Sequence, residues 1–238
     1  MSNLQKKGII LLSGGLDSVV SLAVLKEEIN IKLALTFNYG QKSFENELAA
    51  SKRIADFYNL EHEVINLDWL YKISSSSLTT NSKLPTVKQE DLDNIKETKK
   101  SANSVWVPNR NALFINIAAC FADSKNYTHI VIGANKEEAR TFKDNSNEFI
   151  EAINQSLKYS TNNVPSVIAP LADFDKVQIV KKGIEHKIPF QYLYSCYSNG
   201  EKQCGECESC LRLKRALELN NRYDIISNIF LYVLKIKI

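Results

Sequence analysis

Hydrophobic and polar residues alternate along the chain in blocks that predict strands and helices in turn. Short apolar runs have the length and composition of buried strands. They lie at residues 8–12, 32–37, 62–67, 128–134 and 167–171. Between them, apolar residues recur every three or four positions, which predicts amphipathic helices. These helices begin near residues 17, 43, 111, 145 and 175. Strands that alternate with helices predict an α/β fold, a parallel sheet with helices on both faces.

The alternation breaks down between residues 74 and 104. This stretch is mostly polar, with a serine run at 74–77, and shows no helical or strand period. A segment of about thirty residues without secondary structure is unusual inside a compact domain. Two interpretations stay open at this stage, a lid and a disordered segment.

Composition restricts the class of protein. A chain of 238 residues is long enough for one α/β domain with an appendage. The net charge of +3 is too small to indicate a dedicated nucleic-acid binder. No apolar stretch reaches the roughly 20 residues that a membrane span needs, and no signal peptide is evident at the N-terminus. We therefore expect a cytoplasmic protein with no membrane partner and with reduced thiols.

A Gly-rich string, Ser13-Gly14-Gly15-Leu16-Asp17-Ser18, joins the first predicted strand to the first helix. Its glycines permit a tight turn and a close approach by an anion. The first amides of a helix have no partner within that helix, so they can bind phosphate. Asp17 is unexpected beside an anion unless a metal ion lies between them. This string predicts a phosphate-binding loop.

Four of the five cysteines, Cys196, Cys204, Cys207 and Cys210, lie within fifteen residues. In a reduced compartment, this clustering favours a structural zinc site with four thiolate ligands. Free thiols and an iron–sulfur cluster are the alternatives. The fifth, Cys120, is expected to pack in the core.

The stretch Val107-Pro108-Asn109-Arg110-Asn111 precedes a predicted helix. The guanidinium of Arg110 presents several fixed N–H donors, which suit a carboxylate or a phosphate. An ordinary ion pair with an acidic neighbour is an equally good interpretation of this arginine.

These three features occur in an order that resembles a known family. The Gly-rich string is similar to the pyrophosphate loop (PP-loop) of ATP-pyrophosphatases. Together with residues 107–111 and the cysteine cluster, it resembles the 7-cyano-7-deazaguanine synthases, over about residues 8–223. The resemblance implies a Rossmann-like, adenine nucleotide α hydrolase-like sheet. It divides the chain into an ATP-pyrophosphatase domain, 1–190, and a zinc-binding subregion with a tail, 191–238.

The family reaction implied by this resemblance uses ATP, 7-carboxy-7-deazaguanine and free ammonia. Mg²⁺ would accompany ATP, and Zn²⁺ would be structural. The implied catalytic residues are Ser13, Asp17 and Arg110. The implied ATP-binding residues are Leu12, Ser13, Gly14, Gly15, Leu16, Asp17, Ser18, Val19, Val20, Ser21 and Leu22, with the adenine near Thr36 and Phe37. The implied substrate-binding residues are Arg110, Glu137, Glu138, Asp144 and Asn145.

Two departures from the bacterial pattern are visible. Residues 133–145 resemble the archaeal branch, although Lys143 stands where a proline is usual there. The tail, 224–238, ends in an apolar run that we expect to pack on the domain; a contact in a homodimer is the weaker alternative. Two rival functions are a tRNA-modifying PP-loop ATPase and a zinc module that binds nucleic acid, and neither is favoured.

Overall fold

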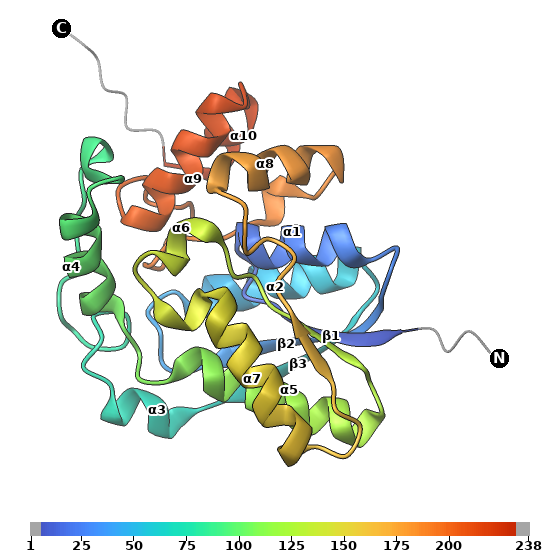
Figure 1. Ribbon diagram of the computed structural model, residues 1–238. Helices are drawn as coiled ribbons and strands as arrows, with labels where there is room; N and C mark the ends of the chain where they lie inside the picture. Colours follow the sequence, from blue (N-terminus) through green and yellow to red (C-terminus); the bar gives the residue numbers. More distant parts are fainter. Residues whose placement is uncertain (1–5, 232–238) are drawn as a thin grey trace, which may run out of the picture.

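The predicted strands form one parallel sheet in a computed structural model that describes residues 6–231 (Figure 1). The strands are β1 (Lys7–Leu11), β2 (Asn30–Asn38), β3 (Glu61–Asn66), β4 (His129–Val131) and β5 (Ser166–Ile168). Their order is β3-β2-β1-β4-β5, and every neighbouring pair is parallel. The predicted α/β fold is therefore confirmed. The chain reverses its direction of winding at β1, and ligands of such sheets bind beyond the carboxyl ends of the strands at that point.

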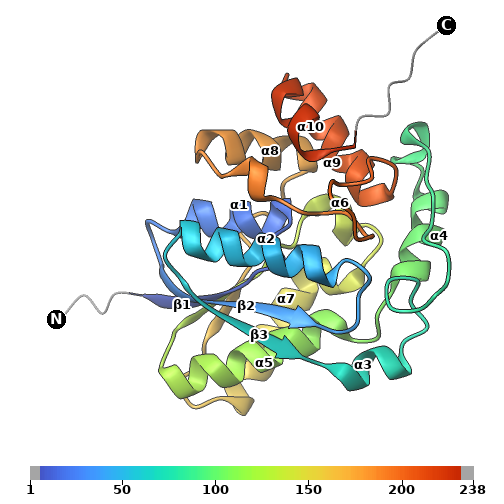
Figure 2. The ribbon, with the colours of Figure 1, turned by 180° about the vertical axis from the view of Figure 1, so that it is seen from behind.

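Helices cover both faces of the sheet (Figures 1 and 2). One face carries α1 (Leu16–Leu25), α2 (Phe44–Phe57) and α8 (Lys176–Glu185), and the other carries α5 (Arg110–Lys125) and α7 (Asn147–Ser160). Successive side chains of a strand point to opposite faces. Ile10 of β1 accordingly packs in the core under α1, while Ile9 packs in the core under α5.

Two helices between β3 and α5 were not predicted from the sequence, and one of them lies in the polar stretch. They are α3 (Asp68–Ile73) and α4 (Ile95–Val105), and the short 3₁₀ helix η1 (Gln89–Asp91) lies between them. The buried side of α4 consists of Thr98, Ser101, Ala102 and Val105. Because small and polar residues form most of this side, the helix produces no apolar period in the sequence.

Residues 74–104, called the arm below, are attached to α9 (Glu208–Leu219). The Ser101 hydroxyl donates a hydrogen bond of 2.5 Å to the Glu208 carboxylate. Arg212 donates to the Leu92 carbonyl oxygen at 3.0 Å, and Arg215 pairs with Asp93 at 2.8 Å. Figure 2 shows α4 beside the C-terminal helices. The arm is thus held in place by α9, and its use as a lid stays a prediction.

The C-terminal part packs on the main domain. Leu213 and Leu217 of α9, together with Ile225 of α10 (Tyr223–Ile229), belong to the same core as α1 and α8. Of the predicted apolar tail, Ile229 and Phe230 are buried as expected. Residues 232–238 lie outside the described part of the chain. The boundary near residue 190 therefore separates two parts of one core.

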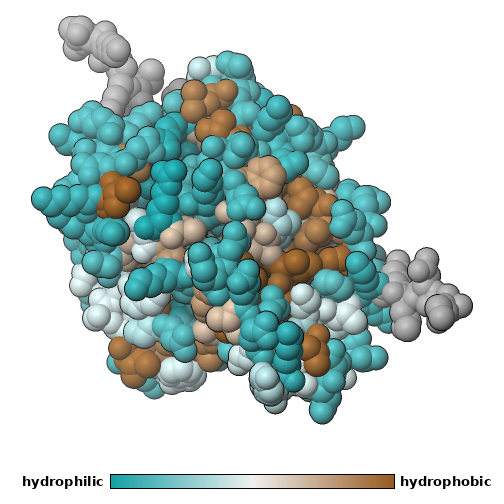
Figure 3. Space-filling view, viewed as in Figure 1, coloured by the Kyte–Doolittle hydropathy of each residue, from teal (hydrophilic) through white to brown (hydrophobic). Residues whose placement is uncertain are grey.

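Within residues 6–231, no helix combines the length and apolar character of a membrane span. Figure 3 shows a face that is mostly hydrophilic, with hydrophobic residues scattered in small groups.

Candidate functional site

The Gly-rich loop leaves β1 and enters α1 at the carboxyl edge of the sheet. Gly14 has φ +75°, and a Cβ atom there would lie 2.6 Å from the Ala50 Cβ of α2. Gly133, which follows β4, approaches α1 so closely that a Cβ atom would lie 2.8 Å from the Ser18 nitrogen. The glycines therefore allow the loop and the end of β4 to meet around the N-terminus of α1.

The polar groups of this loop point toward one another. The Ser13 and Ser18 hydroxyl groups lie 3.3 Å apart, and Ser18 also donates to the Gly15 carbonyl oxygen at 3.1 Å. The N–H groups of the first turn of α1 have no partner within the helix, and the helix dipole places positive charge at this end. The arrangement fits a bound anion, as the sequence predicted.

Asp17 lies in a network that no sequence motif indicated. Its carboxylate accepts hydrogen bonds from the Lys176 ammonium group and from the Asn135 side chain, the latter at 3.3 Å. Lys176 also pairs with Glu138 at 3.0 Å. One oxygen of Asp17, Oδ1, is buried and has no hydrogen-bond partner in the described structure. Asp17, Lys176 and Glu138 thus join the starts of three helices, α1, α8 and α6 (Lys136–Ala139).

Burial and charge shift the pKa values of this network in different directions. Burial raises the pKa of Asp17 to about 6, although the nearby Lys176 opposes the rise. Burial alone would lower the pKa of Lys176, but Asp17 and Glu138 raise it overall. For Glu138, burial is outweighed by Lys176, and the pKa falls below its ordinary value. Such shifts cluster at functional sites because binding and catalysis need desolvated charges.

The raised pKa of Asp17 predicts a pH-dependent stability. The folded chain binds this proton more tightly than the unfolded chain, whose pKa is 3.8, so stability is lost as the pH rises through about 6. The variant Asp17→Asn has no ionisable carboxyl group at this position, so it lacks this pH dependence. We expect the melting temperature of the variant, relative to wild type, to rise by about 3 °C or more between pH 5 and pH 8. Calorimetry at pH 5 and pH 8 measures both melting temperatures. A difference between variant and wild type that stays the same or falls from pH 5 to pH 8 would contradict the prediction.

Arg110 begins α5, as the sequence predicted. It is held by the Tyr39 hydroxyl at 3.3 Å and by the Asn111 side-chain oxygen at 3.3 Å. Within the described chain it forms no ion pair. Burial alone would lower the pKa of Arg110, but Tyr39 and Asp144 raise it, so the group stays charged. A half-buried guanidinium without a carboxylate partner is suited to an anionic ligand.

A cavity of about 280 Å³ lies between these groups. Six predicted site residues on α1 and its loop line it: Leu12, Ser13, Gly15, Leu16, Asp17 and Ser18. The other predicted ATP-binding residues do not: Gly14 packs against α2, and Val19, Val20, Ser21 and Leu22 are buried in the core. Thr36 and Phe37, where adenine was expected, also line the cavity.

The structure divides the predicted substrate-binding residues into two groups. Arg110, Glu138 and Asn145 line the cavity, whereas Glu137 and Asp144 do not. The Glu137 carboxylate points to α9 and pairs with Arg212 at 2.6 Å and with Arg215 at 3.6 Å. Both arginines contact Oε2, while Oε1 accepts from the Lys176 backbone N–H at 2.8 Å, so Glu137 links α6, α8 and α9.

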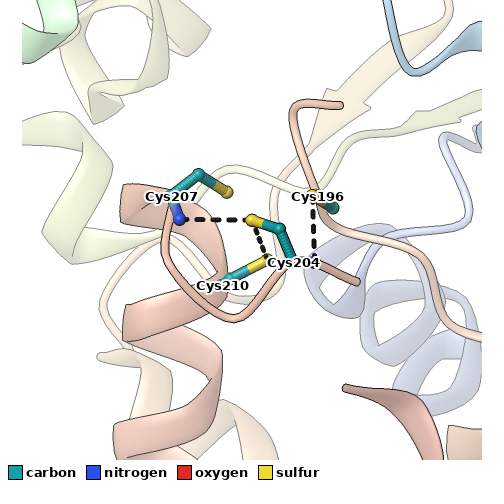
Figure 4. Close-up of side chains that lie close together, drawn as sticks. All are labelled: Cys196, Cys204, Cys207 and Cys210. Atoms are coloured by element: carbon teal, nitrogen blue, oxygen red, sulfur yellow. Dashed lines mark hydrogen bonds between the residues drawn. The ribbon is translucent and has the colours of Figure 1, made fainter. Parts of the chain in front are cut away.

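The four clustered cysteines meet at one point (Figure 4). Their sulfur atoms all lie within 4.8 Å of one another, and the Sγ atoms of Cys204 and Cys210 are 3.8 Å apart. Four ligands at about 2.3 Å around a tetrahedral ion have sulfur atoms about 3.8 Å apart. The backbone N–H groups of Glu206 and Cys207 donate to the Cys204 sulfur at 3.4 and 3.3 Å, which stabilises a thiolate. The residues fit a single metal ion.

The loop that carries Cys196 packs directly against the Gly-rich loop. Tyr194 donates its backbone N–H to the Gly14 carbonyl oxygen at 3.0 Å, and the Leu16 N–H points to the Ser195 hydroxyl at 3.4 Å. Loss of the cysteine cluster would therefore disturb the anion-binding loop.

Cys120 is exposed, so the expectation that it packs in the core was wrong. The buried side of α5 consists of Ile115, Ala118, Ala119 and Ala122. A helix turns about 100° per residue, and this rotation takes Cys120 away from that side.

Several functional residues were missed by the sequence analysis, and Lys176 is the clearest. It is the first residue of α8, after the capping residue Asp175. A lysine is unfavourable at this end of a helix dipole, and its burial needs carboxylate partners. A lysine at a helix start after the last strand was thus a signal that could have been used. Tyr39 and Glu47 lie in stretches, 39–41 and 46–48, that also resemble the family, but the sequence gave them no role. Asn135 gave no comparable signal.

The parallel sheet, the Gly-rich loop at its carboxyl edge and the four-cysteine cluster define the class of protein, a PP-loop enzyme with an ATP-binding fold and a cysteine cluster capable of binding a metal. A family model described as "Queuosine biosynthesis protein QueC" matches residues 7–221. The chain belongs to the QueC family.

Similar proteins agree with this assignment. A 7-cyano-7-deazaguanine synthase of Methanobrevibacter smithii is 48% identical over 219 residues, which cover 92% of this chain and 96% of the relative. The enzyme of the same name from Carboxydothermus hydrogenoformans is 48% identical over 212 residues, which cover 89% of this chain and 98% of the relative. These equal identities do not separate an archaeal from a bacterial branch. A solved structure of the U34-tRNA thiolase NcsA from Methanococcus maripaludis has a TM-score of 0.47 and 16% identity. The match covers 95% of this chain and 72% of the thiolase chain.

Proposed function

We propose that this protein is a ligase that converts 7-carboxy-7-deazaguanine and ammonia to 7-cyano-7-deazaguanine with ATP. The observation that carries the proposal is the 48% identity to a synthase of that product, over 96% of the length of the relative. The cavity supports it, because a helix N-terminus suited to phosphate and a guanidinium without an ion pair in the described chain line the same space.

The reaction needs two activations of the same carbon atom. In the first, a carboxylate oxygen attacks the α-phosphorus of ATP, and pyrophosphate leaves. Ammonia then displaces AMP and gives the amide, with release of a proton. In the second, the amide oxygen attacks another ATP, pyrophosphate leaves again, and loss of AMP and of both N–H protons gives the nitrile. Both activations develop negative charge on the leaving pyrophosphate.

The chain supplies groups that stabilise this charge. The first amides of α1, with Ser13 and Ser18, would donate hydrogen bonds to the phosphates. Lys176 lies beside Asp17 and stays positively charged near the α-phosphate position. Arg110 would bind the substrate carboxylate and orient it for attack.

A magnesium ion fits the residues present. The buried Asp17 Oδ1 has no partner in the described structure, and carboxylate oxygens are preferred Mg²⁺ ligands. Asp17 would hold the ion that arrives with ATP, and that ion would neutralise phosphate charge. Lys176 keeps the other oxygen of Asp17 in place.

The cysteine cluster would hold a structural zinc ion at Cys196, Cys204, Cys207 and Cys210. All four sulfur atoms are within 4.8 Å of one another. In a four-iron cluster each cysteine binds a different iron, so its sulfur atoms would be farther apart. Four thiolates leave no coordination position for water, which supports a structural role.

A single assay tests the proposed reaction. Purified protein with ATP, Mg²⁺, ammonium and 7-carboxy-7-deazaguanine is expected to form the nitrile, with two AMP and two pyrophosphate per nitrile. Mass spectrometry of the base and quantitation of AMP check the ratio. Formation of AMP without nitrile, or activity only with tRNA present, would contradict the proposal.

A further inference from the structure

Glu47 of α2 is a carboxylate in the cavity wall that forms no ion pair within the described chain. Its Oε1 accepts a hydrogen bond from the Ser43 hydroxyl at 2.5 Å, and its Oε2 accepts one from the Gln41 amide at 3.0 Å. Burial raises the pKa of Glu47, although these two hydrogen bonds and Arg110 oppose the rise. A desolvated carboxylate of this kind is costly to keep without further donors.

The position of this carboxylate is fixed by a second layer of contacts. Gln41 also donates to the Phe37 carbonyl oxygen at 2.9 Å, and its own oxygen accepts from the Tyr39 N–H at 3.0 Å. All groups of the Gln41 amide are therefore satisfied, and its orientation is determined. Each Glu47 oxygen accepts one bond and has room for another. The two oxygen atoms of a carboxylate can accept from a pair of parallel N–H donors.

The other candidate carboxylates are paired with a cation or lie outside the cavity lining. Asp17 and Glu138 share Lys176, and Glu137 pairs with Arg212 outside the cavity lining. Asp144 does not line the cavity. Among these carboxylates, only Glu47 both lines the cavity and lacks an ion pair within the described chain.

The charges of the cavity also match a ligand with two unlike ends. Arg110 and Glu47 both line the cavity, and neither forms an ion pair within the described chain. Phe37 and Phe114, whose rings stack at 4.0 Å, provide aromatic surface in the same wall. A flat base with a carboxylate at one end and N–H donors at the other is complementary to this set.

We propose that Glu47 recognises the base of the substrate. Its carboxylate accepts hydrogen bonds from the ring N–H and the exocyclic amino group of a guanine-like base. This inference rests on the proposed function for the identity of the base. It makes Glu47 the residue that distinguishes a 2-amino base from a base without that group. A site built to accept a donor rejects a ligand that lacks it, because the buried acceptor is then left unpaired.

The test compares 7-carboxy-7-deazaguanine with 7-carboxy-7-deazahypoxanthine, which lacks the 2-amino group. Wild type is expected to prefer the first by about 100-fold or more in kcat/KM. In Glu47→Gln the preference should fall to about tenfold or less, since one acceptor and the charge are lost. The KM for ATP should stay within about threefold. Ser43→Ala, which removes one donor to Glu47, should give an intermediate preference.

Two controls separate this role from a structural one. Glu45→Gln changes an exposed residue of the same helix and should leave the preference unchanged. Arg110→Lys should weaken binding of both bases equally, because both carry the carboxylate. An unchanged preference in active Glu47→Gln, or a raised KM for ATP alone, would overturn the inference.

Calorimetric titration of each base without ATP distinguishes the two proposals. If wild type binds the guanine form more tightly, and Glu47→Gln does not, then Glu47 reads the base even if no nitrile forms. If nitrile forms and Glu47→Gln still discriminates in binding, the inference fails and the proposed function stands. If wild type binds both bases equally, the inference fails whatever the reaction.

Discussion

Asp17→Asn is expected to lower pyrophosphate release by about 10³-fold while the chain stays folded. The substitution keeps the size of the side chain but removes the charge that Lys176 and an incoming cation share. It also replaces one of the two carboxylate oxygens by an NH2 group, which cannot bind a cation. One of these oxygens, Oδ1, is buried without a partner in the described structure, and the other accepts from Lys176. Both activations in the proposed reaction depend on this position, so the amide intermediate should not accumulate either. Pyrophosphate release with 7-carboxy-7-deazaguanine measures the effect.

Asp175→Asn is a matched control for this variant. Asp175 precedes Lys176 and caps α8, with its carboxylate accepting from the Gln178 N–H at 2.8 Å. Asparagine caps helices about as well as aspartate, so this variant should keep nearly full activity. Circular dichroism would show that both variants are folded. If Asp17→Asn released pyrophosphate within about tenfold of the wild-type rate, the assignment of the loop would be wrong.

Cys207→Ser is expected to remove the bound metal and to lower the melting temperature by about 10 °C or more. Metal binding to such a site is part of the free energy of folding, and a structural ion contributes several kcal/mol. Because Tyr194 and Ser195 contact the Gly-rich loop, the KM for ATP should also rise. Elemental analysis for zinc and iron, followed by thermal unfolding, measures the loss.

Cys120→Ser controls for the loss of a thiol as such. Cys120 is exposed and lies outside the cluster, so its replacement should change neither metal content nor melting temperature. Wild-type protein should carry one zinc per chain. Wild type purified without zinc, or with iron and inorganic sulfide in its place, would refute the zinc site. A full metal content in Cys207→Ser would show that three thiolates suffice.

The parts predicted well from the sequence depend on neighbours in the chain. The strands, the turn at Gly14 and Gly15, and the helix that starts at Arg110 follow from local apolar period and local turn chemistry. The cysteine cluster was equally visible, because a metal site within fifteen residues is almost a local structure. Where the apolar period was absent, as in α4, the prediction failed, since contacts with α9 stabilise that helix.

Burial was harder to predict than secondary structure. Cys120 was assigned to the core on a helix whose buried side is one residue away. The resemblance assigned Val19 to Leu22 to ATP binding; α1 buries their side chains in the core, and their role toward ATP stays a prediction. In both cases the helix was predicted correctly, and the orientation of its faces depended on the sheet and the helices packed around it.

The sequence by itself determined the chemistry that the chain can offer: an anion-binding loop, a guanidinium at a helix start and four thiolates. Only the tertiary structure decided which charges have partners. Lys176 lies 159 positions from Asp17 and neutralises it, while Arg212 and Arg215 hold Glu137 away from the cavity. Glu47 and Arg110 were left without ion-pair partners within the described chain. Parallel strands bring distant segments to one edge of a sheet, and the pairing of charges there depends on distances that no local pattern encodes.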